Sequence, residues 1–366
     1  MGLRCGIVGL PNVGKSTLFN ALSNAKAESA NYPFCTIEPN VGVVTVPDAR
    51  LQVLEEIVNP ERVVPTIVEF VDIAGLVKGA SKGEGLGNKF LANIREVDAI
   101  IHVVRCFDDP NIVHVAGGVD PVFDKDVIDT ELQLKDLESI DKKLQKSERS
   151  AKSGDAVAKK EVAALQRFKA HLEAGNNARS LDASEEELAA VEDLQLLTIK
   201  PVIYAANVDE ASIPAGGNKY VDALRTHIAN ENAQVVVISA AIESQIAEMD
   251  DPEEKAMFLG EYGLTESGLD KLIRASYDIL NLITYFTAGV KEVRAWTIHR
   301  GDKAPAAAGV IHSDFEKGFI RAEVIKLDDY VQYRSEAKIK EAGKMAVEGK
   351  EYVVQDGDIM HFRFNV

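Results

Sequence analysis

The segment from Gly9 to Ser16 has the residue types and spacing of a phosphate-binding loop. Its sequence, Gly-Leu-Pro-Asn-Val-Gly-Lys-Ser, has Gly at the first and sixth positions and a Lys-Ser pair directly after the second Gly. An apolar run predicts a short strand over 3–9, and the residues from 17 to 23 predict the first turns of a helix. This order directs consecutive backbone N–H groups and a helix N-terminus at one anion. We therefore expect the chain to bind a nucleoside triphosphate.

Each position of this loop has an expected task. We assign nucleotide contacts to Asn12, Val13, Gly14, Lys15, Ser16 and Thr17. Lys15 would reach the outer phosphates and take part in catalysis, and the Ser16 hydroxyl would bind Mg²⁺. Asn12 lies where some G proteins coordinate a K⁺ that replaces an arginine finger, so K⁺ is a candidate second ion.

A second element of the site closes an apolar strand predicted over 66–73. Asp72-Ile-Ala-Gly75 matches the D-x-x-G sequence of G proteins, in which the Asp holds Mg²⁺ through water and the Gly N–H meets the γ-phosphate. Between the two elements, Thr36 is the natural switch threonine, although an ordinary loop threonine would look the same. The sequence thus predicts a magnesium site made by Ser16, Thr36 and Asp72.

The base-reading sequence departs from that of GTPases. They use N-K-x-D after a strand, whereas this chain has Asn207-Val-Asp-Glu210. The extra methylene of Glu210 moves the acceptor by about 1 Å, which spoils a paired hydrogen bond to guanine. Val208 replaces the lysine that lies along the base. Adenine is therefore the expected base, and GTP stays an alternative because Asp209 could replace the acceptor after a register shift.

Two further features concern the base loop and hydrolysis. Ser239, Ala240 and Ala241 fit the S-A-x loop that closes over the base. After D-x-x-G, Leu76 stands where Ras-like enzymes carry the Gln that orients the attacking water. Hydrolysis is therefore expected to be slow or to use another residue. His114 is the candidate, although a lone loop histidine is more often structural.

The elements that must position these residues alternate between strand and helix. Apolar runs over 41–46, 66–73 and 99–105 predict strands of a mostly parallel α/β sheet, which resumes at 201–207 and 234–239. Between them, the heptad-like spacing of leucines predicts an inserted antiparallel helical hairpin. Short β-branched runs at 293–298, 319–325, 352–354 and 359–364 predict a separate β-rich domain. The expected parts are 1–125 and 200–280 for the nucleotide domain, 126–199 for the hairpin and 281–366 for the β-rich domain.

Charge is unevenly distributed along the chain. The net charge of the 366 residues is −17, which excludes a generic polyanion binder, yet residues 135–170 carry ten Lys/Arg against six Asp/Glu. This local excess favours an RNA or ribosome contact by the hairpin, and a simple helical spacer is the alternative. No apolar run approaches a membrane span, no secretory signal is visible, and the three cysteines suit a reducing compartment. We expect a cytoplasmic protein without a membrane partner or DNA specificity.

Taken together, these motifs resemble the YchF/Obg-like ATPase family of P-loop proteins. The phosphate loop, Asp72-Ile-Ala-Gly-Leu-Val-Lys-Gly-Ala, Asn207-Val-Asp-Glu and Phe286-Thr-Ala-Gly-Val-Lys-Glu-Val-Arg-Ala-Trp carry the resemblance, which runs nearly end to end. Residues 317–322 and 356–358 resemble the TGS module, a ubiquitin-like β-grasp domain. The resemblance implies an ATPase that prefers ATP over GTP, has an apolar residue in place of the catalytic Gln, and associates with ribosomes.

The expected function is a slow, Mg²⁺-dependent ATP switch on the ribosome, bound as the large subunit or the 70S particle. The hairpin and the TGS domain would then contact RNA or ribosomal protein. Two alternatives remain at this stage. One is a GTP-dependent ribosome or translation GTPase, and the other is a nucleotide-gated binding module with negligible turnover.

Overall fold

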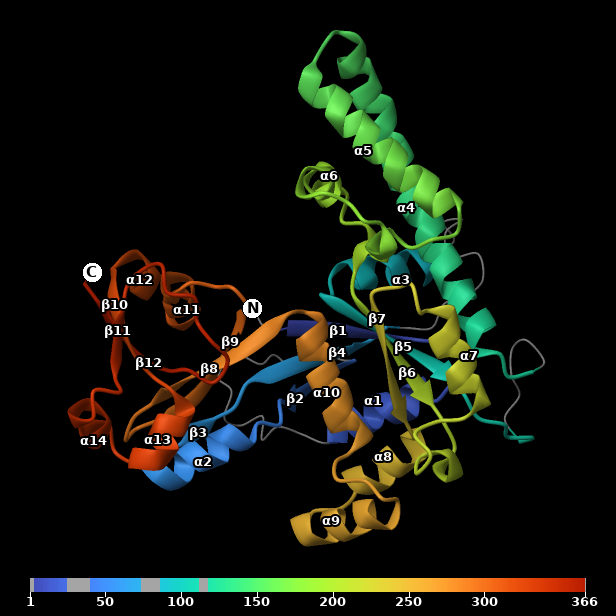
Figure 1. Ribbon diagram of the computed structural model, residues 1–366. Coiled ribbons are helices and arrows are strands. Elements are labelled where there is room, and N and C mark those ends of the chain that lie inside the picture. Colours follow the sequence, from blue (N-terminus) through green and yellow to red (C-terminus); the bar gives the residue numbers. More distant parts are fainter. Residues whose placement is uncertain (1–2, 25–39, 74–85, 112–117, 366) are drawn as a thin grey trace. The chain divides into compact units, whose positions relative to one another are not determined.

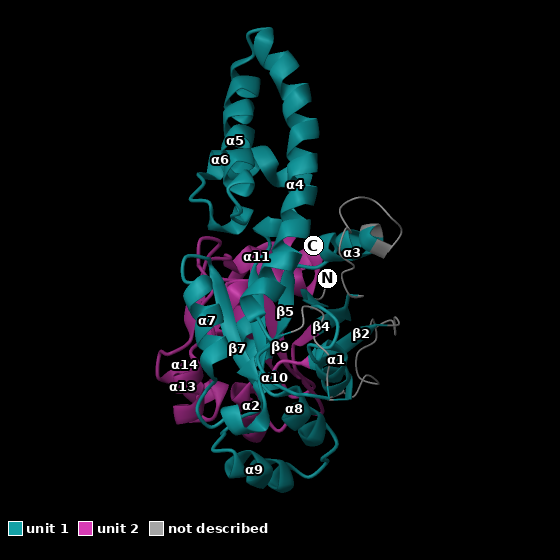
Figure 2. Cartoon of the chain, turned by 90° about the vertical axis from the view of Figure 1, so that its right-hand side faces the viewer, with its two compact units in different colours: residues 1–44, 69–276 teal, residues 45–68, 277–366 magenta. Residues whose placement is uncertain are grey.

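The computed structural model describes residues 3–24, 40–73, 86–111 and 118–365, and these form two compact units (Figures 1 and 2). The first unit comprises residues 1–44 and 69–276, and the second comprises residues 45–68 and 277–366. Four predicted positions, Thr36, Gly75, Leu76 and His114, lie outside the described residues.

A six-stranded sheet forms the centre of the first unit. Its order is β2 (Val41–Thr45), β4 (Ile67–Asp72), β1 (Leu3–Val8), β5 (Ala99–Arg105), β6 (Val202–Asn207) and β7 (Ala233–Ile238). Strands β1, β5, β6 and β7 pair in parallel. Every residue of β5 and β6 is buried, as expected for central strands of a sheet covered on both faces. The predicted mostly parallel α/β sheet is confirmed, and it resumes after the hairpin as expected.

Helices of the first unit follow the strands along the chain. They are α1 (Lys15–Asn24), α3 (Leu86–Arg95), α4 (Pro121–Lys152), α5 (Ala156–Glu173), α6 (Glu185–Val191), α7 (Lys219–His227), α8 (Ala240–Ala247), α9 (Pro252–Glu261) and α10 (Gly268–Ile279). Short 3-10 helices are η3 (Ala178–Ser180), η4 (Glu192–Leu194), η5 (Leu197–Ile199) and η6 (Glu210–Ser212).

Helices α4 and α5 form the inserted hairpin, which projects from the sheet of its unit (Figure 1). Asp120 caps α4 by accepting from the N–H groups of residues 122 and 123, so the helix begins ahead of the expected boundary at 126. Asp155 caps α5 in the same way. Ile140 of α4 packs with Leu165 and Phe168 of α5, which confirms the predicted helical insertion.

Buried charges hold the base of the hairpin against the sheet. Lys125 Nζ lies 2.6 Å from Asp129 Oδ2 and 2.8 Å from Glu231 Oε1, and Arg179 Nη2 lies 2.7 Å from Glu231 Oε2. Burial opposes ionisation of Asp129, but Arg179 and Lys125 hold its pKa below the ordinary value. Breaking one partner of such a buried set leaves an uncompensated charge, so the set fixes where α4 leaves the sheet.

The second unit contains its own six-stranded sheet. Its order is β11 (Ala346–Glu348), β10 (Phe319–Ile325), β12 (Ile359–Phe364), β8 (Leu282–Ala288), β9 (Val293–His299) and β3 (Val63–Val64). Strands β8 and β9 are antiparallel, whereas β12 lies parallel to β8. The helices are α2 (Ala49–Val58), α11 (Ala304–Ile311), α12 (Ser313–Lys317), α13 (Leu327–Tyr333) and α14 (Glu336–Glu341).

Residues 45–68 belong to this second unit although they lie between β2 and β4 in sequence (Figure 2). Leu51 and Leu54 of α2 pack in one core with Phe286 and Ala295, and β3 pairs with β9. Arg50 reinforces this packing through a 2.8 Å ion pair to Asp356. From the sequence these residues are expected in the 1–125 part of the nucleotide domain, because an apolar helix gives no sign of which distant core it joins.

Two expectations for the C-terminal strands differ from the structure. The run at 352–354 forms no strand, and only a single bridge joins Val353 to Lys303. In contrast, β8 was not predicted, because the apolar run over 282–288 follows α10 without an intervening Gly or Pro. In the part of the chain that is described, every helix is too short or too polar to cross a lipid bilayer.

Candidate nucleotide-binding site

The predicted phosphate loop lies between β1 and α1, as the sequence requires. Gly14 has a φ of +93°, and Asn12 also has a positive φ of 65°. A Cβ atom on Gly14 would lie 2.2 Å from Asn207 Nδ2, so no larger residue fits there. Lys15 begins α1, and Ser16 and Thr17 are exposed in its first turn. The loop thus ends at a helix N-terminus, which is the geometry that binds a phosphate.

Lys15 and Asp72 come together in this structure. Asp72 is the last residue of β4, and its Oδ1 forms an ion pair with Lys15 Nζ. Both side chains are partly exposed, so the pair is open to exchange with a ligand. A γ-phosphate offers Lys15 the same kind of anionic partner, and Asp72 would then be released for a cation.

Oxygen donors at this point fit Mg²⁺. The Asp72 carboxylate and the exposed Ser16 hydroxyl both come from segments that the Lys15–Asp72 contact brings together. Mg²⁺ prefers such hard oxygen ligands and is held in nucleotide sites by one or two of them together with phosphates. These residues are therefore suited to the ion, and Thr36 stays a prediction because it lies outside the described residues.

Asn207 joins the phosphate loop to the base loop. Its Nδ2 donates to the carbonyl of Val13 at 2.9 Å, and its Oδ1 accepts from the N–H of Ala240 at 2.9 Å. The side chain is buried, and β6 holds it at the carboxyl edge of the sheet. One amide thus fixes two loops that start on different strands and holds them close together.

The loop after β7 brings Ser239, Ala240 and Ala241 to the start of α8. Ser239 is 1% exposed, and its Oγ has no hydrogen-bond partner within the described residues. A buried hydroxyl without a partner is costly unless a ligand or water satisfies it. This loop therefore carries a polar group suited to a bound base or sugar.

Residues 208–210 have three different environments. Val208 is buried, so its side chain packs inside the fold. Asp209 caps η6, with its Oδ1 accepting from the N–H of Ser212 at 2.8 Å. Glu210 is only partly exposed, and its Oε2 accepts from the hydroxyl of Tyr262 at 3.2 Å. The register shift that would let Asp209 read guanine would cost this cap.

Sequence motifs did not identify Arg105, Tyr262 or Gln245. Arg105 ends β5 beside Asn207 and is 1% exposed. Its guanidinium donates to the carbonyls of Phe107 and Asp109 at 3.1 and 3.3 Å, and so shapes the loop that leads towards residue 114. A buried arginine at the carboxyl end of a central strand was the available signal, but an arginine at a strand end has no motif value by itself.

The two described cysteines take no part in this site. Cys5 and Cys106 are free and buried, and burial raises the pKa of each thiol to about 12. Both thiols are therefore protonated and unreactive near neutral pH.

Comparisons with known proteins cover the whole chain. A family profile described as "50S ribosome-binding GTPase" matches residues 4–151, and the profile of the YchF-GTPase C-terminal domain, described as a protein of unknown function, matches residues 282–365. A Pasteurella multocida protein named "Ribosome-binding ATPase YchF" is 61% identical over 366 residues and is covered completely, as is this chain. A Bacillus subtilis protein of the same name is 59% identical over 368 residues, again with complete coverage of both chains.

Solved structures also match this chain over nearly its whole length. The structure of the Schizosaccharomyces pombe YchF GTPase has a TM-score of 0.89 and 41% identity, and the match covers 99% of this chain and 98% of that one. A GTP-binding protein from Pyrococcus horikoshii has a TM-score of 0.59 at 22% identity, and the match covers 99% of this chain and 100% of that one. At this identity the match shows only that the fold is shared.

Proposed function

Because this chain belongs to the YchF family, we propose that it is a ribosome-binding ATPase that hydrolyses ATP to ADP and phosphate. The observation that supports this most directly is the Asn207 side chain, which ties the phosphate loop to the base loop and opens the sequence in which Glu210 replaces the guanine-reading Asp. The chain thus has a built nucleotide site with an altered base reader.

We propose that the phosphate loop, Lys15 and the start of α1 hold the triphosphate. The N-terminus of α1 and the backbone of residues 12–17 surround the phosphates, and Lys15 exchanges Asp72 for the outer phosphate oxygens. Mg²⁺, when bound to Ser16 and Asp72, offsets the negative charge that the phosphates develop. Phosphoryl transfer depends mainly on such positioning and charge stabilisation.

Turnover is slow in this proposal because a leucine stands where other enzymes carry the water-orienting glutamine. His114 is the residue we propose for positioning the attacking water, and we propose K⁺ at Asn12 as the second ion of the site. The nucleotide state, read through the switch residues, would then set how the protein engages the ribosome. The expected compartment is the cytoplasm.

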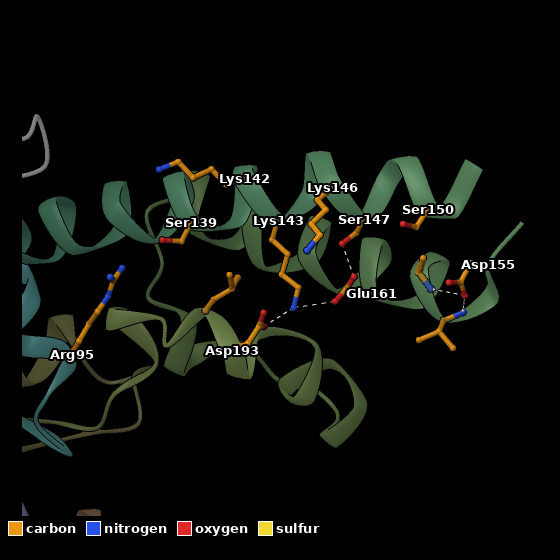
Figure 3. Close-up of a pocket in the computed structure, with 13 residues that line it drawn as sticks. Arg95, Ser139, Lys142, Lys143, Lys146, Ser147, Ser150, Asp155, Glu161 and Asp193 are labelled. Atoms are coloured by element: carbon orange, nitrogen blue, oxygen red, sulfur yellow. Dashed lines mark hydrogen bonds and ion pairs between the residues drawn. The ribbon is translucent and has the colours of Figure 1, made fainter. Parts of the chain in front are cut away.

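The hairpin supplies a surface for the ribosome. A cleft of about 700 Å³ lies along α4 and is lined by cations and hydroxyls together with three carboxylates (Figure 3): Arg95, Ser139, Lys142, Lys143, Lys146, Ser147, Ser150, Asp155, Glu161 and Asp193. Lys143 is held by Glu161 and Asp193, whereas Lys146 makes no ion pair with any described residue. The Lys146 amine and the neighbouring hydroxyls of α4 suit a phosphate backbone, so we propose RNA as the contact of this face.

Residues 281–366 of the second unit are proposed as the TGS domain. Its core strands have the order β9-β8-β12-β10-β11, with β12 parallel to β8, which is the order of a ubiquitin-like β-grasp sheet. We propose that this domain also contacts the ribosome or its RNA. The ribosomal partner would be either the large subunit or the 70S particle.

Hydrolysis assays with ATP and GTP, each with and without ribosomes and K⁺, test this function. The expected result is ATP turnover that exceeds GTP turnover and changes when ribosomes are added. Preferred GTP turnover would favour the translation-GTPase alternative. Binding of ATP without measurable turnover under any of these conditions would favour the nucleotide-gated module.

A further inference from the structure

Both carboxylate oxygens of Glu210 accept hydrogen bonds from within the chain. Oε2 accepts from Tyr262 Oη at 3.2 Å, and Oε1 accepts from Gln245 Nε2 at 3.5 Å. Gln245 lies in α8, which begins directly at the base loop, and Tyr262 follows the last residue of α9. Two segments downstream of the base loop therefore converge on the one carboxylate that replaces the guanine reader.

The Tyr262 hydroxyl is well placed to remain a donor. Its ring packs edge-on against Phe258, with centroids 5.3 Å apart, which fixes the ring direction. Partial loss of water and the neighbouring Glu210 charge raise the pKa of Tyr262, so the phenol stays protonated. The donor is thus held in place by packing and by its charged acceptor.

The hydrogen bonds to the two Glu210 oxygens affect base preference, because guanine and adenine present different donors to a carboxylate. Guanine offers a ring N–H and an amino N–H side by side, and it needs a carboxylate that turns one lone pair of each oxygen towards them. Adenine offers one amino group on that side and makes no such pair. Asp209 cannot replace Glu210 without losing its cap on η6. A guanine base would therefore have to turn a carboxylate whose orientation two donors of the chain already hold.

We propose that Tyr262 and Gln245 set the base preference of the site by occupying both oxygens of Glu210. This inference rests on the proposed nucleotide-binding function and names two residues that act through Glu210 as positioning residues. Specificity here comes from blocking the competitor as well as from accepting the preferred base. The lengthened carboxylate is then only part of the reason for ATP preference.

The test is calorimetric titration of nucleotide-free protein with non-hydrolysable ATP and GTP analogues in Mg²⁺. In the double variant Tyr262→Phe with Gln245→Ala, both donors are gone while the ring that packs on Phe258 remains. We expect the ATP:GTP affinity ratio to fall by about tenfold, mainly through tighter GTP binding, since a hydrogen bond to a charged group has that scale.

A third change shows whether Glu210 is the cause. Adding Glu210→Gln to the double variant replaces one acceptor oxygen by a donor amide, and we expect the gained GTP affinity to disappear. Tyr330→Phe is the matched control, because Tyr330 Oη donates to Glu336 Oε1 at the same 3.2 Å in the second unit. That variant should keep the original ratio.

Two outcomes would overturn the inference while ATP binding persists. One is an unchanged ATP:GTP ratio in the double variant, and the other is a gain of GTP affinity that survives Glu210→Gln. A wild-type protein that binds neither analogue would instead overturn the proposed function, and this inference with it.

Discussion

Lys15 shows how one side chain can serve two partners at the nucleotide site. It forms an ion pair with the Asp72 carboxylate at the phosphate loop. When phosphates arrive, the same ammonium group can turn to them, and Asp72 becomes available to a cation. The ion pair therefore stands where the triphosphate and its metal would meet.

Replacing Lys15 by Ala should abolish measurable ATP binding. The substitution removes the phosphate cation and leaves the Asp72 carboxylate facing the incoming anion without compensation. Titration calorimetry with a non-hydrolysable ATP analogue measures this directly. Lys350→Ala, at an exposed position of the second unit, is the charge-matched control and should bind normally. Retained ATP affinity in Lys15→Ala would show that the phosphates bind elsewhere.

Asn207→Ala should destabilise the first unit and weaken ATP binding together. The change leaves the Val13 carbonyl and the Ala240 N–H unpaired in a buried place, at a cost of about 2 kcal/mol in the free energy of unfolding. Urea denaturation and ATP titration are the two measurements. Asn230→Ala, at an exposed site, is the control. Wild-type values for both quantities in Asn207→Ala would exclude the bridging role.

Local motifs predicted the residues of the site that act within a few positions of one another. The phosphate loop, Asp72 at a strand end and Asn207 all follow directly from strand–loop patterns. Tyr262 did not, because it reaches Glu210 across 52 positions, and Gln245 reaches it across 35. Such contacts depend on how α8 and the end of α9 pack against residue 210. A short sequence motif cannot predict that packing.

At the scale of elements, Glu243 links the base loop to the helix that leaves the first unit. It lies in α8, is buried, and accepts from the N–H of Gly268 at 2.7 Å and of Leu269 at 3.2 Å. These groups are the start of α10, whose free N–H groups need acceptors. Burial raises the pKa of Glu243 to about 7 despite these two bonds.

The raised pKa of Glu243 predicts a loss of stability as pH rises. Between the model-compound value of 4.5 and about 7, the folded state holds a proton that the unfolded state has released. The free energy of unfolding therefore falls across this window, by about 2–3 kcal/mol from this group. Glu243→Gln should remove that part of the pH dependence, as measured by urea denaturation at pH 5 and pH 8.

The matched control for this prediction is Glu254→Gln, at an exposed position of α9. The quantity to compare is the change in unfolding free energy between the two pH values. Equal changes in Glu243→Gln and the unsubstituted protein would mean that Glu243 ionises alike in the folded and unfolded chains.

The hairpin cleft leads to a prediction about the ribosome. Lys146→Ala should weaken ribosome binding and reduce the slope of log affinity against log salt by about one, because one phosphate contact is lost. ATP affinity should not change. Lys169→Ala is the control on the same hairpin, since Lys169 Nζ is already paired with Asp141 at 2.7 Å. Equal effects of the two variants on cosedimentation with ribosomes would argue against a contact at the cleft.

Element prediction succeeded where periodicity was long and failed where it was short. The hairpin follows from apolar spacing sustained over many turns, and Asp155 caps the start of its second helix, α5. Strand β8 was missed because its apolar run is continuous with the helix before it. The prediction of a strand over 352–354 was wrong, because three residues are too few to show the period of two that identifies a strand.

At the scale of the whole molecule, the second unit is discontinuous in sequence. Residues 45–68 leave the first unit after β2, contribute α2 and β3 to the second unit, and return as β4 to end at Asp72. The chain that carries Asp72, the carboxylate we propose as a magnesium ligand, therefore passes through the core of the other unit first. Sequence analysis could not place this segment, because its partners follow more than 200 residues later.

Residues 277–366 alone should fold poorly. They lack α2, whose Leu51 and Leu54 complete the core around Phe286, and burying two leucines contributes about 5 kcal/mol. A fusion of residues 45–68 to 277–366 through a Gly/Ser linker restores these groups and is the matched comparison. The fusion should melt at least about 10 °C higher by circular dichroism. Equal melting temperatures would show that α2 is dispensable for this unit.

The discontinuity of the second unit also sets an order of events during synthesis. Leu51 and Leu54 leave the ribosome roughly 230 residues ahead of Phe286, which at about 5–20 residues per second is a delay of about 10–45 seconds. During that time the apolar face of α2 has no core to enter, while the strands on either side of it can already join their own sheet. The nascent chain therefore carries an exposed hydrophobic loop through most of its translation, and that loop is a natural point of contact for chaperones.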